Sequence, residues 1–314
     1  MLFQTYPNIE MIIVDDASTD KSEEQIEKFL TEIPLYQSAA KNPGAIFNVN
    51  HIKFIQNKDN LGNCVAFNLA LQKCKGKYII DLAADDVLMD ERIDKQVKIF
   101  EELSEDYGVI FSNAIYINEE DKVLRYHFET DENGKSKTLV PSENVYQSIF
   151  ERYFIPTATM MIRRTVLEEL HGYDENLSYE DFDFWVRSSR NHLYFYQDEV
   201  TTLKREVKGS HSFSFYQKNN NPHLESTLLV CHKARVLNQN EEENQALAKC
   251  VEYHLRQSFY TQNFDLVKGY QILLDKLIKK PKSPFLRLIL LLSKCKIRIF
   301  WLYQLYFRIR KKLV

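Results

Sequence analysis

Three pairs of adjacent acidic residues have the types and positions that could support chemistry: Asp15-Asp16, Asp85-Asp86 and Glu180-Asp181. Carboxylate oxygens bind hard divalent cations, accept hydrogen bonds from N–H and hydroxyl groups, and can take a proton as a general base. Each pair could instead turn the chain or cap a helix without binding anything. Whether each pair forms a ligand site or has a structural role therefore depends on the secondary-structure elements around it.

The first pair follows a short apolar run, Ile9 to Val14, which predicts a buried strand. Ser18 or Asp20 can then cap a helix that continues to Leu30. The pair is thus expected at the end of a strand, where open α/β sheets bind their ligands.

The second pair follows a predicted strand from Tyr78 to Leu82 and the small residues Ala83 and Ala84. The two alanines leave room for a ligand to lie against the backbone, and the carboxylates after them can hold a cation that also binds substrate phosphates. On these residues alone, a turn or a cap before the next helix explains Asp85-Asp86 equally well.

The third pair lies near the start of a helix predicted from Ser178 to Arg190, with Ser178 and Asp181 as a capping box. On its own, Asp181 is better explained as a first-turn carboxylate favoured by the helix dipole.

Trp185 is expected in the core rather than as a platform for a sugar, because its helix has an apolar face to bury. Arg187 can pair with Asp183 four residues earlier, and we expect this pair to be solvated and worth only roughly tenths of a kcal/mol.

The order of the predicted elements indicates an α/β protein. A strand from Ile52 to Ile55 and a helix from Val65 to Gln72 separate the strands of the first two pairs. This alternation predicts βαβ units and a mostly parallel sheet flanked by helices. Further strands are predicted at 107–117 and 157–162, and further helices at 142–154 and 165–171. After about residue 219 the pattern is helical, beginning with Asn221 as a cap and Pro222 at the first helical position.

Charge and cysteine content constrain the setting of the protein. The chain has 314 residues, 44% of them hydrophobic, which suffices for one large domain with an appendage. Its five cysteines form no Cys-x-x-Cys pair and are odd in number, so reduced thiols in the cytoplasm are expected. Residues 276–314 hold 12 of the 41 basic residues and no acidic residue, whereas the preceding residues carry 29 basic and 44 acidic residues. A basic segment after an acidic body predicts a separate role for that segment.

Four stretches, in this order, resemble one protein family. They are Tyr6 to Asp20, Asn60-Leu61-Gly62 with Ala66 and Asn68, Leu82 to Asp86, and Gly172-Tyr173-Asp174-Glu175 followed by Glu180 to Arg187. No single stretch is decisive, but their order and spacing together are specific. Over residues 1 to about 215 the chain resembles a family 2 glycosyltransferase of the GT-A fold.

The resemblance implies roles for particular residues. The nucleotide sugar would be bound by six residues: Asp15, Asp16, Asn60, Gly62, Ala84 and Asp85. Asp85 matches the last acid of the family's Asp-x-Asp motif, which typically meets a divalent cation, Mn2+ or Mg2+. Glu180 and Asp181 resemble the acidic pair that supplies the general base. In the company of the other motifs, we prefer this role for Asp181 to that of a helix-start carboxylate.

The sequence also departs from the family's pattern. The first acid of the Asp-x-Asp motif is Ala83 here, an Arg that family members often carry is Phe67, and a metal-binding His falls at Val207. His211 is then a candidate metal ligand in place of that His. The chain appears without the family's first strand and helix, so we expect two unpaired sheet edges and a chain that is poorly active or unstable as given.

The function that the resemblance implies is an inverting, metal-dependent transfer of a sugar. The donor is expected to be a UDP-linked nucleoside-diphosphate sugar and the acceptor a glycan or a lipid-linked molecule, in cell-surface polysaccharide synthesis. Ala83 and Phe67 would also suit a catalytically impaired nucleotide-sugar binding or scaffold protein. A receiver-like α/β domain would explain Asp15-Asp16 but leaves Glu180-Asp181 without a role.

We predict three parts: a GT-A glycosyltransferase domain over 1–218, a helical extension over 219–280, and a basic amphipathic segment over 281–314. In residues 285–312, aromatic and aliphatic residues alternate with Lys and Arg, which is typical of a membrane interface. The competing interpretation is a terminal helix that folds onto the acidic body. Nucleic acid is not an expected partner, because the basic residues are interleaved with long aliphatic ones.

The sequence shows no signal peptide and no apolar run of roughly 18 to 20 residues. We therefore expect a cytoplasmic protein that contacts the inner face of the membrane peripherally.

Overall fold

The computed structural model describes residues 3–39, 51–207, 215–279 and 283–310. The chain divides into two compact units, and each is described by itself. The first unit contains Met1–Val145, Phe154–Glu175 and Ser188–Val207; the second contains Tyr146–Tyr153, Asn176–Arg187 and Lys208–Val314. The domain limits expected from the sequence, at residues 218 and 280, stay a prediction.

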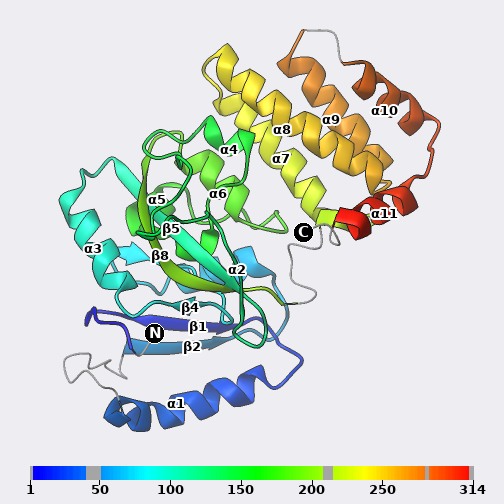
Figure 1. Ribbon diagram of the computed structural model, residues 1–314. Coiled ribbons are helices and arrows are strands. Elements are labelled where there is room, and N and C mark those ends of the chain that lie inside the picture. Colours follow the sequence, from blue (N-terminus) through cyan, green and yellow to red (C-terminus); the bar gives the residue numbers. More distant parts are fainter. Residues whose placement is uncertain (1–2, 40–50, 208–214, 280–282, 311–314) are drawn as a thin grey trace. The chain divides into compact units, whose positions relative to one another are not determined.

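The first unit contains two sheets (Figure 1). The smaller one pairs β1 (Met11–Asp15) with β2 (Ile52–Gln56) in parallel, and Asp15 lies opposite Gln56 at its end. The larger one has the strand order β3-β7-β5-β8-β4, and β6 also pairs with β5. Its strands are β3 (Tyr78–Ile79), β4 (Val87–Leu88), β5 (Tyr107–Ile117), β6 (Val123–Tyr126), β7 (Met161–Arg163) and β8 (Leu193–Arg205).

The expected α/β class is confirmed, but the strand pairing is mixed rather than mostly parallel. The pairs β1–β2 and β5–β8 are parallel. The other described pairs are antiparallel: β3–β7, β4–β8, β5–β6 and β5–β7. The prediction failed here because β3, β4 and β7 are only two or three residues long, and such short pieces carry no periodic signal of their direction.

Both sheets have edge strands in the part of the chain that the structure describes: β1 and β2 in the smaller sheet, and β3 and β4 at the ends of the larger one. β1 pairs there only with β2, and β3 pairs only with β7. Every open sheet has edge strands, so the expectation of two unpaired edges left by an absent first strand stays a prediction.

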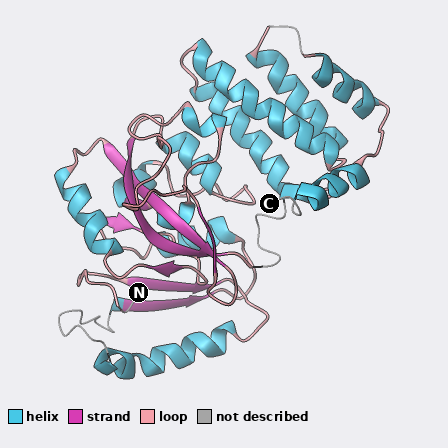
Figure 2. Ribbon diagram, in the orientation of Figure 1, coloured by secondary structure: helices cyan, strands magenta, loops and turns pink. Residues whose placement is uncertain are grey.

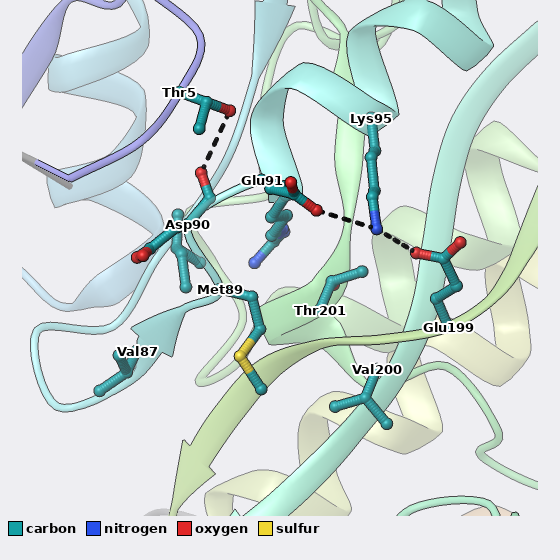
Figure 3. A pocket seen from close by; sticks show the side chains of 11 residues that line it. Thr5, Val87, Met89, Asp90, Glu91, Lys95, Glu199, Val200 and Thr201 are labelled. Carbon is teal, nitrogen blue, oxygen red and sulfur yellow. Dashed lines mark hydrogen bonds and ion pairs between the residues drawn. The ribbon is translucent and has the colours of Figure 1, made fainter. Parts of the chain in front are cut away.

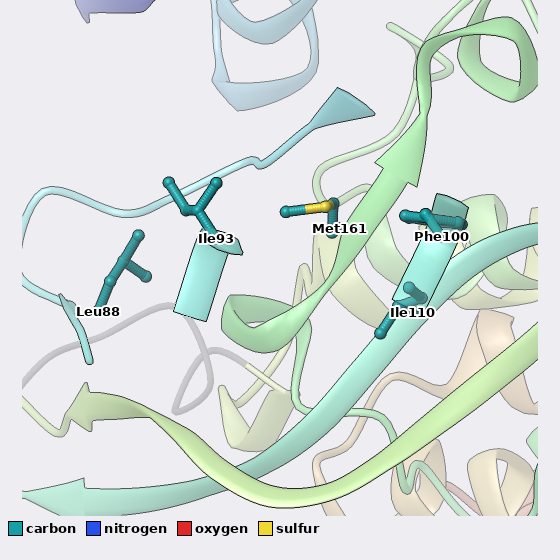
Figure 4. Close-up of a cluster of buried hydrophobic side chains, with 5 residues drawn as sticks. All are labelled: Leu88, Ile93, Phe100, Ile110 and Met161. Atoms are coloured by element: carbon teal, nitrogen blue, oxygen red, sulfur yellow. The ribbon is translucent and has the colours of Figure 1, made fainter. Parts of the chain in front are cut away.

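Helices and a common apolar core support the sheets of the first unit. The helices are α1 (Ser22–Ala39), α2 (Asn63–Leu71), α3 (Arg92–Glu102) and α5 (Arg164–Glu169). One face of α3 places Ile93 and Phe100 beside Ile110 of β5, Met161 of β7 and Leu88 of β4 (Figure 4). The predicted strand 78–82 pairs only through Tyr78–Ile79, while Ile80 and Leu82 pack against this core.

Three local predictions differ from the structure. The segment 157–162, expected as a strand, begins with the 3-10 turn Thr157–Thr159, and only Met161–Arg163 pairs in the sheet. The helix expected over 142–154 is limited to α4 (Ser148–Glu151). β8 has 13 residues and was not expected at all, because its polar residues alternate irregularly with its apolar ones.

The described residues of the second unit form helices joined by loops, without a strand among them (Figure 2). Besides α4 it contains α6 (Asp181–Ser188), α7 (Pro222–Leu237), α8 (Glu241–Tyr260), α9 (Phe264–Leu277), α10 (Pro284–Lys294) and α11 (Phe300–Arg310). The Asn221 side chain accepts a hydrogen bond from the Leu224 N–H at 3.0 Å, which confirms the predicted start of α7. None of the described helices combines the length and the apolar composition that crossing a bilayer requires.

Trp185 and Asp183 of α6 are both in the core of this unit. Trp185 is 2% exposed, as predicted. The expectation of a solvated Asp183–Arg187 pair is wrong, because Asp183 is 1% exposed. Its carboxylate accepts hydrogen bonds from Arg187 Nε and, from α7, Lys233 Nζ, each at 2.6 Å. The packing of α7 on α6 therefore buries an ion pair that the helix sequence alone placed at the surface.

Candidate active site

The first acidic pair lies where β1 ends, and Asp16 binds the loop that follows β2. The Asp16 carboxylate accepts hydrogen bonds from the N–H groups of Leu61 and Gly62, at 3.0 and 2.8 Å, and from Asn57 Nδ2 at 2.8 Å. Its backbone carbonyl accepts from Asn60 Nδ2 at 3.0 Å. The structure thus brings together three of the predicted binding residues, Asp16, Asn60 and Gly62.

These contacts give Asp16 a positioning role. Partial burial acts to raise its pKa, but the hydrogen bonds from Leu61, Asn57 and Gly62 prevail and hold the pKa below its usual value. Gly62, whose N–H donates to Asp16, is the residue directly before α2. Its φ of 87° is a backbone conformation that favours glycine. Asp16 therefore fixes the loop between β2 and α2 and remains ionised.

A pocket of about 730 Å3 lies at the ends of β1 and β2. Its lining includes Asp15, Ser18, Thr19, Asn57, Asp59 and Asn60. Asp15 is 5% exposed, and its carboxylate meets the Ser18 N–H at 3.4 Å. The lining combines acceptor carboxylates with hydroxyl and amide groups, and its volume lies within the usual range for small-molecule sites.

The second acidic pair lies in a turn that β8 holds in place. The Asp86 N–H donates to the Ala83 carbonyl at 3.2 Å, which closes the turn. The Arg205 N–H, at the end of β8, donates to the Asp86 carboxylate at 2.9 Å, and Arg205 Nε donates to the Asp85 carbonyl at 3.1 Å. Burial raises the pKa of Asp86 above its usual value, and the Arg205 N–H only partly offsets this. Asp86 and Arg205 therefore fix the position of Asp85.

The Asp85 side chain itself is exposed, and no described side chain forms a hydrogen bond or ion pair with its carboxylate. The described residues contain no group of three or more His, Cys, Asp or Glu side chains placed to hold a metal ion. A single carboxylate still suits Mg2+ or Mn2+, because such cations are commonly bound by one or two carboxylates together with substrate phosphates and water. The residues present thus fit a cation that arrives with its substrate. His211 lies outside the described residues.

A polar network joins the strand before this turn to α2. Asn68 of α2 donates from Nδ2 to the Tyr173 carbonyl at 2.9 Å and accepts from the Tyr173 N–H at 2.9 Å. The Tyr173 hydroxyl donates to the Asp81 carboxylate at 3.1 Å, and the Tyr173 ring stacks on Phe67 at 4.0 Å between centroids. The Gly172-Tyr173 motif therefore connects α2 to the strand that leads to Asp85.

The third acidic pair lies in the second unit, where α6 starts. The helix begins at Asp181 rather than at Ser178, and Ser178 instead contacts Ser226 Oγ at 2.9 Å through its N–H. The Glu180 carbonyl accepts the Phe184 N–H at 2.9 Å, and the Asp181 carboxylate accepts the Phe182 N–H at 2.7 Å. Both acids are partly exposed. Their predicted part in catalysis stays a prediction.

A further pocket of about 560 Å3 lies beside β4 and the start of α3 (Figure 3). Lys95 Nζ lies between two carboxylates that line it, at 3.3 Å from Glu91 and 3.0 Å from Glu199. Lys95 is thus shared by two carboxylates, and Arg92, which also lines the pocket, is buried and donates to the carbonyls of Ala158 and Met160, so we do not include this pocket in the candidate site.

The sequence missed three residues that shape the site: Asn57, Asp81 and Arg205. Asn57 follows β2 directly, so the rule that pointed to Asp15 after β1 also points to it. Asp81 lies within the predicted strand from Tyr78 to Leu82, where its charge interrupts an apolar run. Arg205 carried no comparable signal, since its role depends on β8.

Comparisons with known proteins agree with this architecture. The sequence profile described as Glycosyl transferase family 2 matches residues 1–170. An uncharacterized glycosyltransferase of Methanocaldococcus jannaschii is 30% identical over 209 residues, which are 65% of this chain and 62% of the relative. The chain thus spans less than two thirds of the length of that curated relative.

Solved structures show the same fold. S. aureus TarS residues 1–349 in complex with UDP superpose with a TM-score of 0.62 at 16% identity, covering 94% of this chain and 81% of that one. The mannosyltransferase PcManGT from Pyrobaculum calidifontis, in complex with GDP-Man and Mn2+, gives a TM-score of 0.51 at 13% identity, covering 91% and 71%. These similarities support the GT-A fold with a helical C-terminal extension. Because the family profile covers more than half of the 314 residues, the chain belongs to glycosyl transferase family 2.

Proposed function

We propose that the protein transfers a sugar, with inversion, from a nucleoside-diphosphate sugar to a glycan or a lipid-linked acceptor, in the synthesis of a cell-surface polysaccharide. The observation that carries the proposal is in the first unit. A polar pocket lies at the ends of β1 and β2, and the turn after β3 presents the carboxylate of Asp85, with which no described side chain forms a hydrogen bond or ion pair. Together they offer a place for a nucleoside and a ligand for the cation of a diphosphate.

In this proposal the pocket holds the nucleoside of the donor. The Asp15 carboxylate accepts a hydrogen bond from the base or the ribose, and Asn57 and Asn60 add amide groups to the lining. Asp16 and Gly62 shape the loop and do not contact the nucleoside. A UDP-linked donor is proposed because the TarS structure contains UDP; GDP in the mannosyltransferase structure is the competing nucleotide.

Asp85 would hold a divalent cation, Mn2+ or Mg2+, which when bound neutralises charge on the leaving diphosphate. Ala84, exposed in the same turn, leaves space for the donor beside the backbone. Asp86 and Arg205 keep the turn in one conformation, so that Asp85 need not be ordered when the donor binds.

Asp181 would act as the general base, and Glu180 would assist it. The carboxylate takes the proton of the acceptor hydroxyl while the acceptor oxygen forms a bond to the anomeric carbon. The bond between that carbon and the donor's phosphate oxygen breaks on the opposite side, and the nucleoside diphosphate leaves with the electron pair. Attack from the opposite side inverts the anomeric configuration.

The test is donor turnover with Mn2+ or Mg2+ in wild type, Asp85→Asn and Asp181→Asn. We expect each substitution to lower kcat by roughly 100-fold or more, as is typical for a lost general base or charge-stabilising group. Asp90→Asn, another exposed carboxylate five residues from Asp85, is the matched control and should retain full turnover.

The turnover measurement, combined with calorimetric titration with UDP, separates this proposal from its alternative. A nucleotide-sugar binding or scaffold protein is favoured by Ala83 and by Phe67, which stacks on Tyr173. Such a protein would bind UDP but show no turnover that depends on Asp85 and Asp181. Absence of both binding and turnover would refute both proposals.

We also place the protein in the cytoplasm, at the inner face of the membrane. None of the five cysteines, all of which the structure describes, forms a disulfide, which suits a reducing compartment. A lipid-linked acceptor would be met at that surface.

A further inference from the structure

The helix α10 has apolar side chains on two opposite faces. Leu286, Ile289, Leu290 and Ser293 are buried, and α10 packs on α8 and α9. On its other side Phe285, Leu288 and Leu291, three residues apart, are 53%, 50% and 59% exposed. A helix that is apolar all round needs an apolar environment on both sides. The body of the second unit supplies only one of them.

The helix α11 is also fixed on one side and apolar on the other. The Tyr303 hydroxyl donates to Gln257 of α8, and its ring stacks on Tyr260 at 5.0 Å between centroids. Trp301, Leu302 and Leu305 are 64%, 44% and 46% exposed. The attachment to the body and the exposed apolar side chains therefore coexist, and folding onto the body does not account for the exposed ones.

Exposed cations lie close to these apolar side chains in the sequence. Arg287 and Lys294 of α10, and Lys296 and Arg298 in the following connection, are all exposed. No acidic residue occurs between 276 and 314 that could neutralise them locally. Indole and long aliphatic groups next to Lys and Arg match the two layers of an anionic lipid surface, acyl chains beneath charged headgroups.

We propose that the outer faces of α10 and α11 form a docking surface for an anionic lipid bilayer. Phe285, Leu288 and Leu291, with Trp301 and its neighbours, enter the boundary between headgroups and acyl chains, and the four cations bind lipid phosphates. A nucleic acid would pair with the cations but would leave the exposed leucines in water, so lipid is the partner that satisfies both kinds of side chain.

Trp301 provides a direct test, because the protein has only two tryptophans and Trp185 is 2% exposed. The full chain is mixed with vesicles of phosphatidylcholine alone or with phosphatidylglycerol. With anionic vesicles we expect a blue shift of the fluorescence and quenching by brominated acyl chains; Trp185→Phe should retain both signals. Salt should weaken binding. An unchanged spectrum, or equal binding to both vesicle types, would overturn the proposal.

Variants test the two components of the surface in a co-sedimentation assay. The first variant, Leu288→Ser with Leu291→Ser, removes apolar contact. The second variant removes the four charges and should weaken vesicle binding by roughly 100-fold; it combines Arg287→Gln, Lys294→Gln, Lys296→Gln and Arg298→Gln. Leu229→Ser with Val236→Ser is the matched control, because these α7 side chains are 45% and 80% exposed in the same unit. Circular dichroism verifies folding in each case.

The control pair should bind vesicles as wild type does. An equal loss in the control, or stronger binding of RNA than of anionic vesicles, would contradict a specific lipid surface. Donor turnover without vesicles should be unaffected by the α10 variants, so a failure of this inference and a failure of the proposed function are distinguishable.

Discussion

Asp81 has an electrostatic environment that makes the stability of the protein depend on pH. Burial raises the pKa of its carboxyl to about 6 from 3.8, although the Tyr173 hydroxyl donates to it and acts in the opposite direction. The folded state thus binds this proton more tightly than the unfolded state. The free energy of unfolding therefore falls as pH rises from 3.8 to about 6 and stays low above that range.

Asp81→Asn should remove this pH dependence while keeping an acceptor for Tyr173. Above pH 6 the variant should be more stable than wild type, by up to about 3 kcal/mol. Below pH 3.8 the two proteins should differ little from this cause. Urea denaturation at both ends of the range measures the effect. A variant with the same pH slope as wild type would show that Asp81 is not the group responsible.

The buried negative charge of Asp183 is compensated by two cationic side chains. Its carboxylate is buried with Arg187 and Lys233, both at 2.6 Å. Asp183→Ala leaves the two cations without it, and the free energy of unfolding should fall by about 3–5 kcal/mol. The exposed pair Asp94–Lys98, at 2.7 Å, is the control: Asp94→Ala should cost under about 1 kcal/mol. Similar losses in both variants, measured with urea, would argue against a special role for burial.

At the scale of elements, Gly172 sets the approach of the Gly172-Tyr173 segment to α2. It has a φ of 75°, and a Cβ at this position would lie 2.2 Å from Asn68 Oδ1. Asn68 cannot retreat without breaking its hydrogen bonds to Tyr173 and Glu175. The close contact therefore depends on both the backbone conformation and the missing side chain.

Gly172→Ala should destabilise the protein by more than about 2 kcal/mol, since strain at positive φ adds to a lost buried network. Gly134→Ala tests the backbone strain alone, because Gly134 has a φ of 74° and a Cβ added there would have no atom within 4 Å. It should cost about 1 kcal/mol. Thermal denaturation of both variants measures the difference, and equal losses would rule out the steric term.

At the scale of the whole molecule, the burial of the five free thiols predicts their order of labelling. Cys295 is exposed, Cys74 is half-buried, and Cys64, Cys231 and Cys250 are buried. Burial, together with the nearby Glu10 carboxylate, raises the pKa of the Cys74 thiol and slows its reaction further.

N-ethylmaleimide should therefore modify Cys295 first and Cys74 slowly, and should reach the three buried cysteines only after denaturation. Mass spectrometry of the intact protein over time counts the modifications. Rapid labelling of Cys231 or Cys250 in the native protein would show that the core between α7 and α8 opens more readily than its burial implies.

Features that depend on neighbouring residues could be predicted from the sequence. An apolar run followed by polar residues located β1 and its acidic end, the limits of β5 agree with the structure, and Asn221-Pro222 marked the start of α7. Order and spacing of the motifs identified the family. These signals are local, because strand alternation, capping and turn formation involve residues a few positions apart.

Which distant residues act together follows from the packing of the folded chain. Lys233 lies 50 positions from Asp183, Tyr173 lies 105 positions from Asn68, and Arg205 lies 119 positions from Asp86. These contacts arise from the packing of α7 on α6, the approach of Gly172 to α2, and the pairing of β8 with β5 and β4. Hydrogen bonds across such separations leave no periodic pattern in either segment. The sequence could therefore predict the acid at position 85 but not the strand that holds it in place.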